Sequence, residues 1–216
     1  MQYSDKDQAI NDKFYGYFLR HNQDDGWDDK DKYGNFKLLA DIINLTHKPL
    51  MSTFILDVGC GTGDLYGYLQ KLALQDNEFS LKNYLGIDLY KMSVEYAQMK
   101  YPEGNFIQGD FLEYNFNQTF DYIFCSGALA AVLDTDNYAM MASFIKKMWS
   151  LATLGVAFNF LTREYEKDKD NELFLYDLDN VLKLCKKNAP SSKIEYIQNR
   201  AGDEEDFLQT HIYLAK

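Results

Sequence analysis

From residue 53 to the C-terminus, short apolar runs alternate with longer segments in which apolar residues recur at helical spacing. Strands separated by helices of about ten to fifteen residues are joined by right-handed crossovers and line up parallel in one sheet. This alternation predicts an α/β fold with a mostly parallel, seven-stranded sheet. The strand segments are FILDV, NYLGID, GNFIQG, FDYIFCS, GVAFNFL, KIEYIQ and FLQTHIYLA, and the helices lie near 62–73, 91–100, 136–150 and 176–187.

The two ends of the chain depart from this alternation. The last two strand segments follow each other with only a polar turn between them, which predicts an antiparallel C-terminal strand. Before residue 50, helical spacing predicts two amphipathic helices, around Ile10, Phe14, Tyr17 and Phe18 and around Phe36, Leu39 and Ile43. A polar loop over residues 21–34 joins them and contains Trp27. We expect an N-terminal helical cap over 1–50, not an independent domain, and one domain over 51–216.

The charge of the chain restricts the kinds of partner that it can bind. The formal net charge is −11 and the sequence pI is about 4.7, without a concentrated basic patch. Such a chain repels a polyanion, so nucleic acid is not an expected partner.

Three widely spaced cysteines offer neither a disulfide framework nor a paired metal-ligand spacing. The N-terminal segment lacks signal-peptide features and no apolar run could cross a membrane, so we expect a cytoplasmic protein without a membrane partner.

A glycine-rich loop follows the first predicted strand in ILDVGCGTGDLYG, residues 55–67. At this switch point of an α/β sheet, ligands bind at the carboxyl ends of the strands. A dinucleotide-binding loop would need its third glycine at position 64, where the chain has Asp64. Asp57 and Asp64 on the two sides of the loop oppose a diphosphate. They favour a ligand with positive charge and no phosphate, such as S-adenosylmethionine, whose ammonium group Asp57 would bind.

The segment ILDVGCGTG resembles motif I of the class I S-adenosylmethionine-dependent methyltransferases. Later segments match that family in order: YLGID with Asp88 and then Ala97, FIQGD with Asp110, and a fourth strand that begins with Phe120 and Asp121. The resemblance implies a Rossmann-like three-layer sandwich in which Asp88 binds the ribose hydroxyls and Asp110 or Phe111 meets the adenine. The residues after the fourth strand would line the reactive end of the cofactor. The implied cofactor-binding residues are Asp57, Gly59, Cys60, Gly61, Gly63, Asp88, Leu89, Asp110, Phe111, Ser126 and Gly127.

The chain departs from the family pattern at three points. Tyr90 stands where the family often has serine, so the helix after the second strand is expected to be capped differently. The turn before the fifth strand is reduced to residues 153–155. After the fourth strand, CSGALA replaces the N/D-P-P-Y motif of enzymes that methylate the amino groups of bases. This segment is uncharged until Asp134, so the acidic ligands of metal-dependent members are missing and we expect no metal.

The resemblance implies methyl transfer by in-line displacement, with S-adenosylhomocysteine as the product of the cofactor. Orientation of the acceptor and exclusion of water supply much of such catalysis, so the family needs no universal catalytic residue and we assign none. Two residues are candidates for contact with the acceptor. Trp27 is either a lid or a core anchor of the cap, and Asn159 either faces the acceptor or satisfies neighbouring backbone. Lys37 or Asn35 is a candidate donor for the cofactor carboxylate, with a solvated helix face as the alternative.

The leading interpretation is a small-molecule methyltransferase, monomeric or homodimeric, whose N-terminal helices cover the acceptor. A protein side-chain methyltransferase remains open, because it would use the same cofactor core. So does a non-catalytic S-adenosylmethionine-binding protein of the same fold. A nicotinamide-dependent oxidoreductase is disfavoured, because Asp64 interrupts the glycine spacing that a dinucleotide requires.

Overall fold

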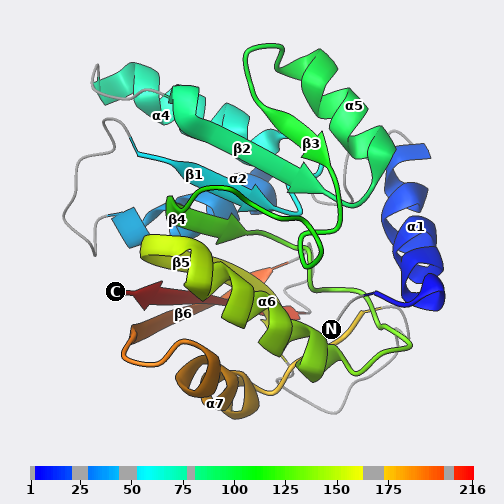
Figure 1. Ribbon diagram of the computed structural model, residues 1–216, viewed down its shortest axis with the longest axis vertical. Coiled ribbons are helices and arrows are strands. Elements are labelled where there is room, and N and C mark those ends of the chain that lie inside the picture. Colours follow the sequence, from blue (N-terminus) through cyan, green and yellow to red (C-terminus); the bar gives the residue numbers. More distant parts are fainter. Residues whose placement is uncertain (1–2, 21–28, 44–52, 77–80, 163–172, 202–206) are drawn as a thin grey trace.

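The computed structural model describes residues 3–20, 29–43, 53–76, 81–162, 173–201 and 207–216. Its helices are α1 (Asp5–Arg20), α2 (Asp29–Ala40), α4 (Asp64–Asp76), the 3-10 helix η1 (Leu81–Asn83), α5 (Lys91–Lys100), α6 (Asn137–Leu151) and α7 (Leu178–Asn188). Its strands are β1 (Ile55–Val58), β2 (Tyr84–Asp88), β3 (Phe106–Gln108), β4 (Phe120–Cys125), β5 (Ala152–Thr162), β6 (Lys193–Ala201) and β7 (Phe207–Ala215). The sheet lies between two layers of helices (Figure 1).

One seven-stranded sheet runs through the molecule in the order β3-β2-β1-β4-β5-β7-β6. The first five strands pair in parallel, and β7 is antiparallel to both β5 and β6. The predicted mostly parallel sheet with an antiparallel C-terminal strand is confirmed. From β1 the chain moves outward to β3 on one side, and from β4 it moves to β5 and β6 on the other side, with β7 returning between these two strands. The switch point of the sheet therefore lies between β1 and β4.

Each face of the sheet has its own hydrophobic core. Successive residues of a strand point to opposite faces, so Ile55 packs with α2, α4 and α5, whereas Leu56 packs with α6 and α7. The apolar face of α6 is buried and includes Met141, Phe144, Ile145 and Met148. Burial of each such side chain is worth roughly 1.5–3 kcal/mol. These two cores hold the carboxyl ends of the strands in fixed positions.

Helix α1 lies outside the two helical layers, across the carboxyl ends of the strands and beside the first turn of α5 (Figure 1). Its start is a capping box, in which Ser4 N–H donates to the Asp7 carboxylate and Asp7 N–H donates to the Ser4 hydroxyl. Asp7 also accepts from Thr135 N–H at 3.0 Å. Burial opposes ionisation, but the hydrogen bonds from Thr135 and Ser4 lower the pKa of Asp7 to about 2. The Tyr15 hydroxyl donates to the Gly127 carbonyl at 3.0 Å, which gives α1 a second attachment.

Helix α2 begins at Asp29, inside the segment predicted to be a polar loop. That prediction is wrong for residues 29–34. The inward face of α2 carries Lys32, Asn35, Phe36 and Leu39, all of which are buried. Because the first two of these inward residues are polar, apolar periodicity becomes visible in the sequence only from Phe36 onward.

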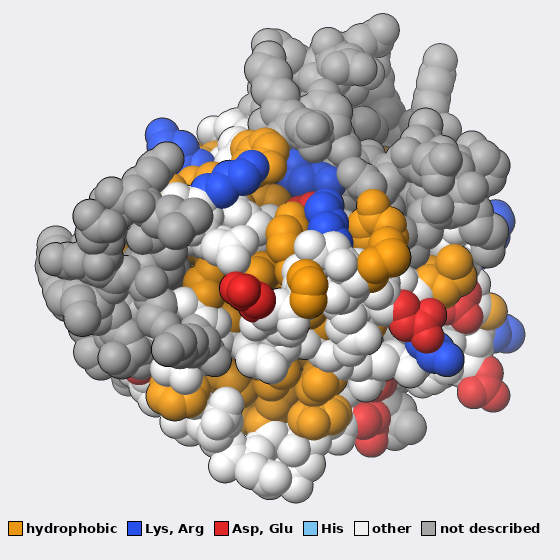
Figure 2. Space-filling view, turned by 90° about the horizontal axis from the view of Figure 1, so that it is seen from above, with side chains coloured by type: hydrophobic (Ala, Val, Ile, Leu, Met, Phe, Trp, Pro, Cys, Tyr) orange, Lys and Arg blue, Asp and Glu red, His pale blue; other side chains and the backbone are white. Residues whose placement is uncertain are grey.

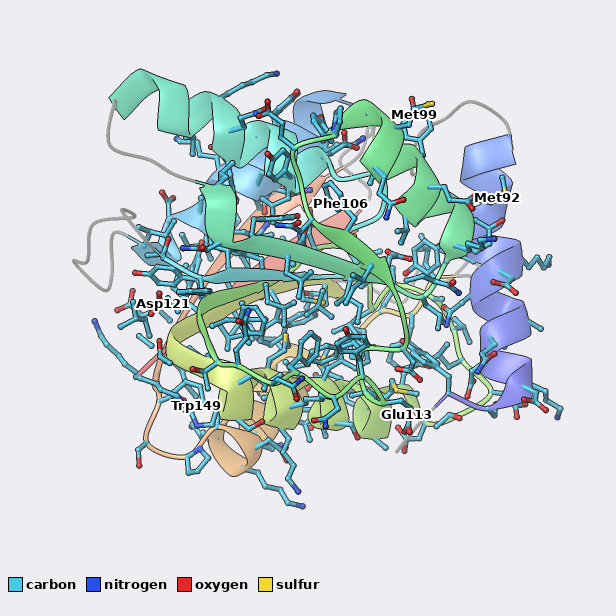
Figure 3. All side chains as sticks on the ribbon, turned by 45° about the horizontal axis from the view of Figure 1, so that its top comes forward. Met92, Met99, Phe106, Glu113, Asp121 and Trp149 are labelled. Atoms are coloured by element: carbon cyan, nitrogen blue, oxygen red, sulfur yellow. The ribbon has the colours of Figure 1, made fainter. Side chains whose placement is uncertain are left out.

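Two aspartates stabilise the fold by accepting hydrogen bonds from backbone N–H groups. Asp136 caps α6, because its carboxylate accepts from the N–H groups of Tyr138 and Ala139. Asp121 lies at the end of the sheet opposite α1 (Figure 3), where it accepts from Phe54 N–H at 3.0 Å.

In the described part of the chain, no helix combines the length and the apolar character needed to cross a membrane.

Candidate functional site

A cavity opens at the carboxyl ends of β1, β2 and β4, with residues of α1 and α2 in its wall. It therefore lies at the switch point of the sheet, where α/β folds bind ligands. The sequence-predicted residues that line it are Asp57, Gly59, Cys60, Gly61, Asp88, Leu89, Phe111, Ser126 and Gly127. Gly63 and Asp110 are not part of the lining.

The glycine loop adopts backbone conformations that favour glycine. Gly59, Gly61 and Gly63 have φ angles of 71°, 51° and 79°. A Cβ atom at Gly59 would lie 2.4 Å from the Cβ of Ala128, and one at Gly63 would lie 3.0 Å from the ring of Phe106. A Cβ atom at Gly61 would meet nothing within 4 Å. The first and third glycines thus permit close packing, whereas Gly61 leaves open space at the cavity wall.

Asp88 joins the glycine loop to α5. Its carboxylate accepts from Gly61 N–H at 2.9 Å and from Tyr90 N–H at 2.8 Å. Tyr90 is the N-cap residue of α5 and makes no side-chain cap hydrogen bond, while its own N–H donates to Asp88. Burial raises the pKa of Asp88, and the two backbone hydrogen bonds oppose that rise. The carboxylate is therefore held in one orientation at the cavity wall.

Asp57 is buried on the face of β1 that turns toward α2 and α4. It is 1% exposed, and the Tyr84 hydroxyl donates to it at 2.5 Å. Burial raises the pKa of Asp57 to about 7, with smaller contributions from the negative charges of Asp88 and Asp64, while the Tyr84 bond opposes the rise. A cationic group placed beside Asp57 would favour its ionised form.

Asp64 has a different environment. It accepts hydrogen bonds from Lys32 Nζ at 2.9 Å, Lys100 Nζ at 2.6 Å and Thr62 Oγ1 at 2.8 Å. Although burial opposes ionisation, the two lysines and Thr62 lower the pKa of Asp64. From the sequence, the charge of Asp64 was expected to oppose a diphosphate in the loop. In the structure two ammonium groups neutralise Asp64, whereas Asp57 and Asp88 have no cationic partner among the described residues.

Residues 55–148 match the family model described as a methyltransferase domain. This segment of the chain is therefore similar to a methyltransferase domain. No curated protein sequence matches the chain. The glycine loop, Asp88 and the residues after β4 all lie within the matched segment, whereas α1, α2 and the last two strands lie outside it.

Solved structures of methyltransferases share the fold of the whole chain. A magnesium protoporphyrin IX methyltransferase from Synechocystis PCC 6803 with bound SAM has a TM-score of 0.70 at 17% identity, covering 99% of this chain and 98% of that one. The N-methyltransferase NodS from Bradyrhizobium japonicum WM9, in complex with S-adenosylhomocysteine, has a TM-score of 0.67 at 13% identity, covering 98% and 99%. A TehB-like methyltransferase from Corynebacterium glutamicum has a TM-score of 0.60 at 19% identity, covering 96% and 99%.

The N-terminal helices add residues to the cavity that the sequence did not reveal, apart from Asn35. Tyr3, Asn11 and Tyr15 line the cavity from the side of α1, and Lys32 and Asn35 line it from α2. Asn35 was a sequence candidate for contact with the cofactor carboxylate, whereas the alternative Lys37 is exposed on another face of α2. Lys32 was missed because it fell within the predicted loop. The sequence feature that could have identified Lys32 is its position one helical turn before Phe36, but a polar residue there does not extend the apolar pattern.

Gly127 is held from two sides at the end of β4. Its N–H donates to Asn159 Oδ1 at 2.8 Å, and its carbonyl accepts from the Tyr15 hydroxyl at 3.0 Å. Asn159 is buried and does not line the cavity. Its Nδ2 atom has no hydrogen-bond partner among the residues that the structure describes. In this geometry Asn159 contacts the loop that lines the cavity, and it joins β5 to α1 through Gly127.

Asp110 forms a turn after β3. Its carboxylate accepts from Leu112 N–H at 2.8 Å, and its carbonyl accepts from Tyr114 N–H at 2.8 Å. These bonds place Phe111, the next residue, in the cavity wall. Trp27, together with His21 and His47, lies outside the described residues.

Neither a basic patch nor a metal centre accompanies the cavity in the described part of the chain. On the face shown in Figure 2, lysine and arginine side chains lie singly or in small groups among hydrophobic and acidic ones. Among the residues that the structure describes, no group of three or more His, Cys, Asp and Glu side chains is placed to hold a metal ion.

Proposed function

We propose that the protein transfers a methyl group from S-adenosylmethionine to a small-molecule acceptor. The observation that carries this proposal is the cavity of a methyltransferase domain in which Asp57, Asp88 and the glycine loop meet at the switch point. The cavity suits a ligand with a cationic head and no phosphate, because both uncompensated acids lie at its wall. When bound, S-adenosylmethionine supplies the electrophilic methyl group, and the acceptor displaces the thioether in line.

The adenosine part of the cofactor is assigned to the β2 and β3 side of the cavity. Asp88 has its carboxylate fixed by two backbone N–H groups and can accept hydrogen bonds from the ribose hydroxyls. Leu89 and Phe111 line the same side and offer apolar surface to the adenine ring. Because Gly61 leaves open space beside Asp88, the ribose can approach the backbone there.

The cationic end is assigned to the β1 and β4 side. Asp57 would bind the ammonium group, which would draw its carboxyl into the ionised form. Ser126 and Gly127 line the cavity at the end of β4, where we place the sulfonium and its methyl group. No side chain of the chain is assigned to proton transfer, because orientation and shelter from water account for much of the rate of such a displacement.

A small acceptor is supported by the position of α1. This helix lies across the strand ends and contributes Asn11 and Tyr15 to the cavity wall, so an acceptor has to fit beneath or beside it. A side chain on the surface of another protein would have to reach the methyl group from outside the cavity. The contribution of α1 to the cavity wall therefore favours a small molecule over a protein side chain.

Methyl-labelled S-adenosylmethionine tests the proposal directly. The purified protein is incubated with this cofactor and with a cell extract that ultrafiltration has divided into small-molecule and protein fractions. Label transferred to the small-molecule fraction, and lost in an Asp88→Ala variant, is the expected result. Label in the protein fraction would replace the proposal by side-chain methylation, and binding without transfer to either fraction would replace it by a non-catalytic role.

A further inference from the structure

A second, smaller cavity adjoins the one that contains the glycine loop. Its wall is formed by Tyr3, α1, the segment after β4, the first turn of α6 and Tyr176. Three residues line both cavities: Tyr3, Asn11 and Ala128. Because Ala128 directly follows Gly127, the smaller cavity lies next to the place where the proposed function puts the methyl group.

The wall of the smaller cavity is mainly apolar, and hydrogen bonds fix it. Asn137 Nδ2 donates to the Ala131 carbonyl at 2.8 Å, and Asn137 Oδ1 accepts from Leu133 N–H at 3.1 Å. None of the described residues that line this cavity carries a charge at neutral pH. A charged group would lose its hydration there without gaining a partner of opposite charge. The apolar lining residues are Ala128, Leu129, Ala131, Leu133 and Met140.

Asn11 is a polar side chain at the junction of the two cavities. It lies on the same face of α1 as Asp7 and Tyr15, four residues from each. Those two neighbours attach the helix, through the hydrogen bonds of Asp7 with Thr135 and of Tyr15 with Gly127. Asn11 is 8% exposed, and its side-chain amide has no hydrogen-bond partner among the residues that the structure describes. Buried polar groups are normally paired, so an unpartnered amide at a cavity wall is suited to a ligand.

The two cavities differ in the chemistry that they offer. Asp57 and Asp88 line the larger cavity and are not part of the lining of the smaller one. The amide of Asn11 can accept a hydrogen bond at Oδ1 and donate one at Nδ2, so it can bind a hydroxyl or an N–H group. An apolar wall with few polar groups that fix orientation is typical of a small-molecule site. The acidic side therefore suits the cofactor, and the side of Asn11 suits a partner without charge.

We infer that the methyl acceptor is an uncharged molecule with an apolar end and a hydroxyl or N–H group. This inference rests on the proposed function and names its substrate class. The apolar end enters the smaller cavity, and Asn11 binds the hydroxyl or N–H group beside Gly127.

The transfer leaves such an acceptor uncharged. The oxygen or nitrogen of its polar group forms a bond to the methyl carbon while the bond from that carbon to sulfur breaks. The electron pair of the broken bond stays on the sulfur. The proton of the hydroxyl or N–H group leaves to water, so the methylated product has no charge.

Extraction into octanol tests this inference, because S-adenosylmethionine is charged and stays in water. The wild-type protein is incubated at neutral pH with methyl-labelled S-adenosylmethionine and the small-molecule fraction of a cell extract. Chromatography then separates transferred label from unreacted cofactor in each phase. Transferred label should pass into the octanol. Transferred label that stays in water would show a charged or strongly polar acceptor and would overturn the inference.

Ala131→Leu tests the smaller cavity, because the longer side chain would fill it. One methylene in an apolar pocket changes specificity by about 10-fold to 200-fold, so octanol-soluble label should form at least about 10-fold more slowly. The affinity for S-adenosylhomocysteine, measured by calorimetry, should change by less than about threefold. Ala139→Leu is the matched control, since Ala139 is in the first turn of α6 and lines neither cavity. An Ala131→Leu protein with the wild-type rate would overturn the placement of the apolar end.

Asn11→Leu tests the polar contact and serves as the test if Ala131→Leu fails to fold. The rate of label transfer should fall by about 10-fold, because the acceptor loses a hydrogen bond, with the affinity for S-adenosylhomocysteine again within about threefold. A wild-type rate would overturn the role of Asn11. An equal loss of affinity for S-adenosylhomocysteine would assign Asn11 to the cofactor and overturn its role as well.

The inference and the proposed function fail on different results. Label that is transferred to the small-molecule fraction but stays in water would refute the uncharged acceptor and leave the proposed function intact. Absence of transferred label from that fraction would refute the proposed function, and the inference with it.

Discussion

At the scale of single residues, three carboxylates beside one glycine loop have three different environments. Asp57 is buried with one hydroxyl partner, Asp88 is fixed by two backbone N–H groups, and Asp64 is neutralised by two lysines. Burial favours the neutral acid, hydrogen bonds from N–H groups favour the carboxylate, and cations favour it further. Of these three acids, Asp57 is therefore the one poised to change its charge near neutral pH.

Replacement of Asp88 tests the ribose assignment. Asp88→Ala should weaken the binding of S-adenosylhomocysteine by about 1–3 kcal/mol, because hydrogen bonds to a charged group are lost. Isothermal titration calorimetry measures this change. Asp179→Ala, at an exposed position in the first turn of α7, is the control and should bind normally. An unchanged affinity in Asp88→Ala would remove this residue from the ribose role.

The pKa of Asp57 predicts how binding depends on pH. Its folded-state value of about 7 lies above the ordinary value of 3.8, so the free protein binds a proton that a cationic ligand displaces. Affinity for S-adenosylhomocysteine should therefore rise by about tenfold from pH 6 to pH 8. The stability of the ligand-free fold has the opposite dependence on pH. Because folding raises the pKa of Asp57, this residue stabilises the fold fully below pH 3.8, and its contribution is lost as pH rises through about 7.

Asp57→Asn is the control for both effects. The amide keeps an acceptor for the Tyr84 hydroxyl but cannot ionise. Its affinity for S-adenosylhomocysteine should be lower and independent of pH between 6 and 8. Equal pH profiles for the variant and the wild-type protein would show that another group titrates.

At the scale of elements, the sheet and its helices supply the fixed part of the site and α1 supplies a separately attached wall. The cores on both faces of the sheet bury the strands, whereas α1 lies outside these cores, and its contacts with the rest of the chain include the hydrogen bonds of Asp7 with Thr135 and of Tyr15 with Gly127. Because α1 lies outside both cores, we expect it to open at a lower free energy than the sheet.

Asp7→Ala should release the start of α1. Loss of the capping box and of the Thr135 bond is expected to cost about 0.5–2 kcal/mol. Hydrogen exchange should be faster across residues 5–20, and S-adenosylhomocysteine should bind more weakly because α1 contributes to the cavity wall. Asp5→Ala, in the same helical turn, is the control. Because the pKa of Asp7 is lowered to about 2, this stabilisation is present above pH 3.8 and is lost as pH falls toward 2.

At the scale of the whole molecule, most of the fold could be predicted from the sequence. The strands and most helices follow from local periodicity, and β7 and α5 have the predicted bounds or nearly so. The beginning of α2 could not be predicted, since its inward Lys32 and Asn35 mimic a polar loop. The strand-end residues of the site could be predicted because each follows a recognisable strand. The contributions of α1 and α2 depend on how distant helices pack, which no local pattern encodes.

Ligand binding should stabilise the whole chain. A ligand that binds only the folded state at about 100 times its Kd adds about 2.7 kcal/mol. For a chain of this size that corresponds to a rise in Tm of roughly 5–10 °C. Differential scanning calorimetry with S-adenosylhomocysteine measures the shift. NADH at the same concentration should produce none, and a shift with NADH alone would favour an oxidoreductase.

The most direct measurement is a crystal structure with S-adenosylhomocysteine. It should show the ribose hydroxyls at the Asp88 carboxylate, the ammonium group at Asp57 and the thioether sulfur beside Ser126 and Gly127. An empty cavity at saturating ligand, or an adenosine placed anywhere other than against Asp88, would contradict the account.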